Sequence, residues 1–118
     1  LEEFETLGAR IAGAALEGLV IQMARAHIAY RNSDEKLYFW RTRHGPEVDC
    51  VVYGPSTLRA IEIKNTNRVR SEDERALRHF LEDYPEATAT VVYRGSRRLE
   101  RSGISWVPVD EFLLELLP

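Results

Sequence analysis

Two carboxylates and one ammonium group, Asp49, Glu62 and Lys64, interrupt the apolar stretches "EVDCVVY" and "LRAIEIKN", which otherwise have the composition of paired strands. The intervening "GPST" predicts a tight turn in which Gly54 lies opposite Thr57, and this register places Asp49 opposite Glu62. Because strand side chains alternate between faces, the two carboxylates and Lys64 should share one face. The apolar face would then carry Val48, Cys50, Val52, Ile61 and Ile63.

Two carboxylates placed directly opposite each other in a sheet repel, at a cost of up to about 1 kcal/mol. A divalent cation such as Mg²⁺ or Mn²⁺ reverses the sign of this interaction, because it prefers oxygen ligands and completes its shell with water and substrate phosphate. Lys64, beside Glu62, could then orient a metal-bound water or stabilise charge on a phosphate. The alternative is a solvated face on which Asp49 and Glu62 each pair with an arginine.

The elements around these residues predict an α/β domain with the order α-β-β-β-α-β, then a further strand and a closing helix. A first helix is expected over 13–32, with helical structure beginning as early as Phe4. The second helix should start at Ser71 with a capping box to Glu74, and Asp110 should cap the closing helix. Strands are expected over 36–42, 47–53, 58–65, 88–95 and 104–109.

A strand with Asp followed by a strand with Glu-x-Lys, both after a helix with a glutamate, resembles the PD-(D/E)xK nuclease superfamily. More narrowly, "GAALEGLV", "YFWRTRHGPEVDCVV", "AIEIKN", "RSEDERALRHFLEDYPEA" and "VVYRG" resemble the uncharacterised nuclease-like domain that follows an AAA-type ATPase module in many bacterial and archaeal proteins. The resemblance runs from about Leu7 to Val109. It implies a restriction-endonuclease-like fold, a central mixed sheet flanked by helices, and a single domain over 1–118 at the C-terminal end of a longer ATPase chain.

The resemblance also implies roles for individual residues. Asp49 and Glu62 would be metal ligands for Mg²⁺ or Mn²⁺, Lys64 would be the catalytic lysine, and Glu17 would complete the metal shell through water. Glu17 is the only acidic residue between Thr6 and Ser33, which fits a special position on an otherwise apolar helix, although the wet edge of an amphipathic helix is the alternative. The proline that names the superfamily is displaced, because Pro46 stands three residues before Asp49.

The charge balance limits the partners that this domain can have. A net charge of -3 excludes a global basic field of the kind that draws proteins to nucleic acid. The segment 36–70 is locally basic, however, with seven basic and three acidic side chains. DNA phosphates would therefore be contacted locally, by Arg41, Arg43, Arg68 and Arg70.

Other features bound the cellular setting. A single cysteine, Cys50, excludes an internal disulfide and suits a reducing cytoplasm. No apolar run approaches the roughly 20 residues that span a bilayer, so no membrane partner is expected. The apolar "FLLELL" near the end should dock on the sheet, on its own ATPase domain, or on a second subunit of a homodimer.

The sequence thus leads to two hypotheses. The first is Mg²⁺- or Mn²⁺-dependent phosphodiester hydrolysis in DNA. The second is a non-catalytic module of the same fold that binds nucleic acid or protein, which the overall acidity favours.

Overall fold

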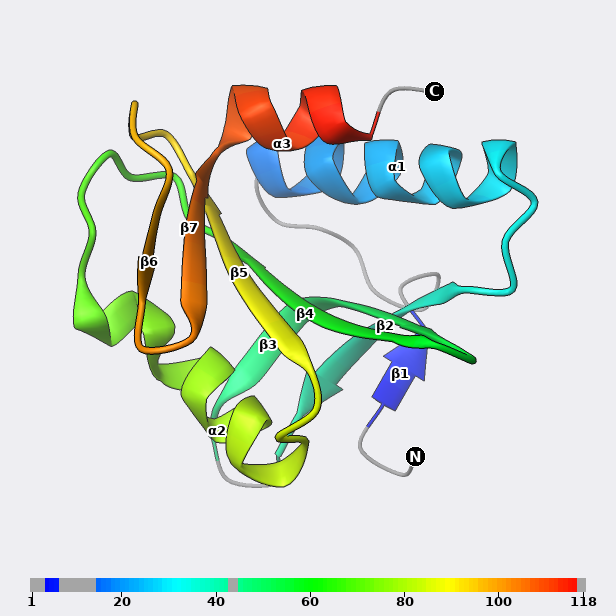
Figure 1. Ribbon diagram of the computed structural model, residues 1–118, viewed down its shortest axis with the longest axis horizontal. Coiled ribbons are helices and arrows are strands. Elements are labelled where there is room, and N and C mark those ends of the chain that lie inside the picture. Colours follow the sequence, from blue (N-terminus) through cyan, green and yellow to red (C-terminus); the bar gives the residue numbers. More distant parts are fainter. Residues whose placement is uncertain (1–3, 7–14, 43–44, 117–118) are drawn as a thin grey trace.

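The computed structural model describes residues 4–6, 15–42 and 45–116, and these form a seven-stranded sheet with helices on both faces (Figure 1). The strands are β1 (Phe4–Thr6), β2 (Lys36–Arg41), β3 (Glu47–Gly54), β4 (Thr57–Ile63), β5 (Thr88–Tyr93), β6 (Leu99–Arg101) and β7 (Ile104–Pro108). The helices are α1 (Ala15–Tyr30), α2 (Arg75–Asp83) and α3 (Val109–Glu115), and a 3-10 turn, η2 (Ser71–Glu74), precedes α2.

The sheet is mixed, with the strand order β1-β2-β3-β4-β5-β7-β6. Strands β1 to β4 pair antiparallel, β5 joins β4 and β7 in parallel, and β6 closes the far edge antiparallel to β7. The chain passes from β4 to β5 through α2, as a parallel connection requires. The predicted α/β class and the α-β-β-β-α-β order are therefore confirmed.

Both faces of the sheet carry a hydrophobic layer. On one face α1 and α3 pack on residues such as Cys50, Val52, Ile61 and Val92. On the other face α2 packs on a second set, which includes Val51, Ala60, Val91 and Trp106. Central strands covered on both faces become apolar throughout. Cys50, Val52, Ile61 and Ile63 share one apolar face as predicted. The face that was expected to carry the charges is apolar as well, because Val51 and Ala60 lie on it.

A bulge in β3 breaks the alternation at the first candidate residue. Tyr38 of β2 pairs with Val51, but Trp40 pairs with Val48, so Phe39 lies opposite two residues, Asp49 and Cys50. As a result Val48 packs on the α2 side, and Cys50 packs on the α1 side. The predicted common face for these two residues was wrong, because a bulge inserts one extra residue and re-aims the side chains next to it.

Several predicted element ends also differ from the structure. Phe4 begins a short strand that pairs with β2, where a helix was expected. Helix α3 follows Pro108, and Asp110 lies in its first turn and makes no side-chain capping bond. The predicted docking of this apolar end is confirmed for the sheet, because Phe112 and Leu116 pack in the core layer with α1.

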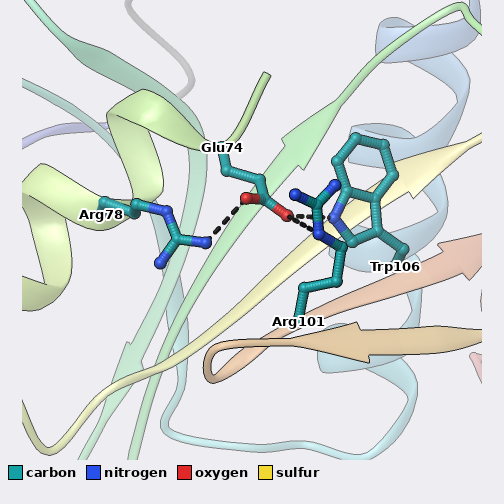
Figure 2. Close-up of polar contacts among 4 residues, drawn as sticks. All are labelled: Glu74, Arg78, Arg101 and Trp106. Atoms are coloured by element: carbon teal, nitrogen blue, oxygen red, sulfur yellow. Dashed lines mark hydrogen bonds and ion pairs between the residues drawn. The ribbon is translucent and has the colours of Figure 1, made fainter. Parts of the chain in front are cut away.

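The capping box at the start of the second helix is absent, because Glu74 has a different role. Neither η2 nor α2 has a side-chain capping bond, and the Glu74 side chain is fully buried. Its carboxylate accepts hydrogen bonds from Trp106 Nε1 at 2.6 Å and from an Arg78 nitrogen at 2.7 Å, and Arg101 Nε lies 3.8 Å away (Figure 2). One carboxylate thus connects η2, α2, β6 and β7.

No helix in the described residues is long and apolar enough to cross a membrane.

Candidate active site

The Asp49 and Glu62 side chains meet where β3 begins and β4 ends. The predicted register is confirmed, because Gly54 pairs with Thr57 and the ladder continues to Cys50 and Ile61. Asp49 and Glu62 lie next to the last of these pairs, beside the bulge in β3, and their side chains are hydrogen-bonded to each other. The structure therefore places the two predicted ligands side by side.

Burial changes the chemistry of Glu62. Its side chain is only 4% exposed. Its neighbours Ile61 and Ile63 both pack on the α1 side, so alternation along β4 directs Glu62 to the face that α2 covers. Burial raises the pKa of the Glu62 carboxyl well above its ordinary range, and the hydrogen bond and negative charge of Asp49 raise it further. The Lys64 ammonium opposes this shift in pKa, as does a hydrogen bond with the Asp49 backbone. A proton or a cation between the two carboxylates would relieve their repulsion.

Replacing Glu62 with glutamine should change how stability depends on pH. Between the ordinary pKa of 4.5 and the raised native value, the unfolded chain has lost the Glu62 proton and the native chain still holds it. The native state then binds more protons, so the wild-type free energy of unfolding should fall as pH rises through this window. Glu62→Gln removes the decline and should be more stable than wild type at neutral pH by about 1 kcal/mol.

Urea unfolding in EDTA over a series of pH values measures this difference. Glu100→Gln, an exposed glutamate on β6, is the matched control and should follow the wild-type curve. Curves for wild type and Glu62→Gln that stay parallel from acidic to neutral pH would contradict the assigned burial of this carboxyl.

Lys64 follows β4 directly and continues its ladder. Its backbone N–H donates to the Val92 carbonyl oxygen at 2.9 Å, which holds the residue at the edge of the parallel β4–β5 pair. The side chain is half-buried, and its charge acts on the Glu62 carboxyl two residues earlier. The predicted juxtaposition of an acid and a lysine is present.

Glu17 lies in the first turn of α1, on the opposite face of the sheet from α2, and one oxygen of its carboxylate is buried. Its negative charge acts on the buried Cys50 thiol, whose pKa is raised to about 12, chiefly by burial. Among the described residues no three His, Cys, Asp or Glu side chains come together as a cation site. The role of Glu17 as a third ligand therefore stays a prediction.

The predicted phosphate-binding arginines lie around the same edge of the sheet. Arg41 ends β2 opposite Glu47 and is exposed. Arg68 and Arg70 are exposed in the segment after β4, and Arg70 forms an ion pair with Glu72 at 3.6 Å. Arg43 lies outside the described residues. The roles of all four arginines in nucleic-acid binding stay predictions.

A fifth arginine, which was not predicted as a site residue, lies near the same end of the sheet. Arg94 follows β5, and its Nε donates to Asn65 Oδ1 at 2.5 Å. Its backbone N–H donates to the Thr66 carbonyl oxygen at 2.8 Å. Because β4 and β5 are parallel, the residues that follow them lie at the same end of the sheet. A prediction of this parallel pairing from the sequence would have placed Arg94 near Lys64.

Comparison with known proteins places the chain in a family. The family described as "Domain of unknown function (DUF4143)" matches residues 12–112. The chain belongs to this family. Two relatives, the uncharacterized proteins Mb2031c of Mycobacterium bovis and Rv2008c of Mycobacterium tuberculosis, are each 32% identical over 102 residues, which is 86% of this chain. The chain spans 22% of the length of these relatives. No solved structure matches.

The DUF4143 description names no cofactor, so the fit of a cation depends on the donors themselves. Asp49 and Glu62 offer carboxylate oxygens that are hydrogen-bonded to each other, and a cation would counteract the raised pKa of Glu62. Two carboxylates suit Mg²⁺ or Mn²⁺, which usually keep water and substrate oxygens in their shell. They do not suit a cation that needs an all-protein cage. The donor chemistry of the pair therefore suits Mg²⁺ or Mn²⁺, and the cation itself stays a prediction.

Proposed function

We propose that this DUF4143 domain hydrolyses phosphodiester bonds in DNA with the help of Mg²⁺ or Mn²⁺. The observation that carries the proposal is the hydrogen-bonded Asp49–Glu62 pair beside Lys64, at a sheet edge rimmed by arginines. Purely structural sheets avoid paired carboxylates, and perturbed acids with a charge partner are typical of active sites. The resemblance to the PD-(D/E)xK superfamily supports the same assignment.

The chain's own residues would divide the work as follows. Asp49 and Glu62 would hold the cation, which supplies Lewis-acid chemistry and charge neutralisation at a phosphate. Lys64 would stabilise negative charge on the reacting phosphate and orient the attacking water. Arg41, Arg43, Arg68 and Arg70 would position the DNA backbone through its phosphates.

A non-catalytic interaction module of the same fold is the second candidate, and one observation favours it. Glu62 is only 4% exposed, so a substrate phosphate reaches this carboxyl only if the surrounding chain gives way. Such a module would bind nucleic acid, a partner protein or an attached ATPase domain. The proposed attachment to an ATPase is compatible with relatives of which this region forms 22%.

Nicking of supercoiled plasmid tests the two candidates. The protein with Mn²⁺ should nick the plasmid, EDTA should stop the reaction, and Mn²⁺ should raise the melting temperature by binding the native state. The double variant Asp49→Asn/Glu62→Gln should lose both effects, and Glu100→Gln should keep both. A rise in melting temperature without nicking would favour the interaction module. If wild type and double variant respond equally to Mn²⁺, the carboxylate pair is not the metal site.

A further inference from the structure

A polar hollow of about 430 Å³ lies over the first halves of β4 and β5 and over β7, beside α3. Strand pairing brings its residues together, because Thr88 lies beside Arg59 and Thr90 lies beside Ser105. These strands run side by side below α3 (Figure 1). The hollow is lined by five hydroxyl side chains: Ser56, Thr57, Thr88, Thr90 and Ser105.

Arg59 is the cation in this hollow that is available to a ligand. Its guanidinium carbon lies 5.9 Å from the centroid of the Phe112 ring, and the residue is half-buried. In the part of the chain that the structure describes, the Arg59 guanidinium makes no hydrogen bond or ion pair. Arg98, on the same rim, is instead occupied by Glu115 at 2.5 Å and by Glu111 at 3.7 Å. The donors of Arg59 are therefore open to an anion, and a guanidinium binds phosphate through two parallel hydrogen bonds.

The hydroxyls beside Arg59 are also available. Thr57 is hydrogen-bonded to Glu35, but the hydroxyls of Thr88, Thr90 and Ser105 make no hydrogen bond in the described part of the chain. Thr90 is only 7% exposed and lines the hollow. Hydroxyls both donate and accept, so they suit a ligand that carries hydroxyl groups of its own.

We propose that this hollow binds a small phosphomonoester with a hydroxylated body, a sugar phosphate or a mononucleotide, with Arg59 holding the phosphate. The carboxylates of Glu86 and Glu115 on the rim repel a polyanion such as nucleic acid and leave room for one phosphate at Arg59. Both carboxylates can accept hydrogen bonds from ligand hydroxyls.

This site is separate from the Asp49–Glu62 pair and does not rest on the proposed nuclease function. Arg59 contacts Phe112 of α3, on the α1 side of the sheet, and Glu62 projects to the α2 side. Along β4, Arg59 and Lys64 are also five residues apart, which corresponds to about 16 Å of extended chain.

Isothermal titration calorimetry of the protein in EDTA tests the proposal with AMP and ribose phosphate. Adenosine, ribose and inorganic phosphate are the comparison ligands. At least one of the two phosphomonoesters should bind saturably and more tightly than its dephosphorylated form and than inorganic phosphate. Arg59→Gln should weaken this binding about tenfold or more, and Arg75→Gln, an exposed arginine on α2, should not change it.

Hydrogen–deuterium exchange of the wild-type protein locates the ligand without relying on a variant. Binding should protect the segments around Thr57 and Thr88. Saturable binding by AMP alone or by ribose phosphate alone supports the site and identifies which body it prefers. The proposal is overturned if neither phosphomonoester binds, if inorganic phosphate or the dephosphorylated ligands bind as tightly, or if protection appears only around Lys64 and Arg94.

Discussion

Replacing Lys64 with alanine should lower Mn²⁺-dependent plasmid nicking about a hundredfold or more, because one positively charged donor aimed at developing phosphate charge contributes on this scale. The backbone N–H of Lys64 bonds to Val92 whatever the side chain is, so the end of β4 should stay in place. The half-buried side chain carries little of the core packing. The loss should therefore appear in the rate of cleavage and not in the melting temperature.

The chain contains a matched control for this variant in its other lysine, Lys36. Lys36 is exposed at the start of β2, opposite Tyr53, at the sheet edge away from Lys64. Lys36→Ala should nick plasmid at the wild-type rate. Equal nicking by wild type and Lys64→Ala would remove Lys64 from the proposed mechanism and leave the carboxylate pair as a binding site only.

Replacing Glu74 with alanine should lower the free energy of unfolding by about 3–5 kcal/mol, the scale on which removing one partner of a buried charge pair acts. The fully buried carboxylate accepts hydrogen bonds from Trp106 at 2.6 Å and Arg78 at 2.7 Å (Figure 2). Without it the buried indole N–H of Trp106 has lost its acceptor, and a cavity remains between η2 and β7. Urea unfolding followed by tryptophan fluorescence measures the loss.

Two further variants separate the contributions. Trp106→Phe removes the indole donor and keeps most of the ring, and Arg78→Met removes the guanidinium and keeps the stem; each should cost less than Glu74→Ala. Glu72→Ala, an exposed acid in the same turn whose ion pair with Arg70 spans 3.6 Å, should change stability by less than about 0.5 kcal/mol. If Glu74→Ala behaves like Glu72→Ala, the buried network contributes nothing to stability.

The sequence predicted those parts of the fold and site that depend on local chemistry. The "GPST" turn sets the register of β3 on β4, so the pairing of Asp49 with Glu62 follows from residues close to each other in the chain. The Glu-x-Lys spacing puts Lys64 beside Glu62 for the same reason. The order from α1 to β5 followed from hydrophobic periodicity, since each amphipathic element buries its own apolar stripe. The short edge strands β1 and β6 were not predicted.

Only the tertiary structure decided which charged residues are buried and which distant segments meet. Glu62 and Glu74 are ordinary glutamates in the sequence, and only the fold buries them. Glu74 is buried against Trp106, which β7 brings from 32 residues further along the chain. Parallel pairing of β4 with β5 brings Arg94 to Asn65, and α3 seats Phe112 under Arg59. A turn or a spacing specifies neighbours a few residues apart, whereas burial and electrostatics depend on every element that packs nearby. The sequence by itself thus determined the candidate pair, and the tertiary structure determined its environment.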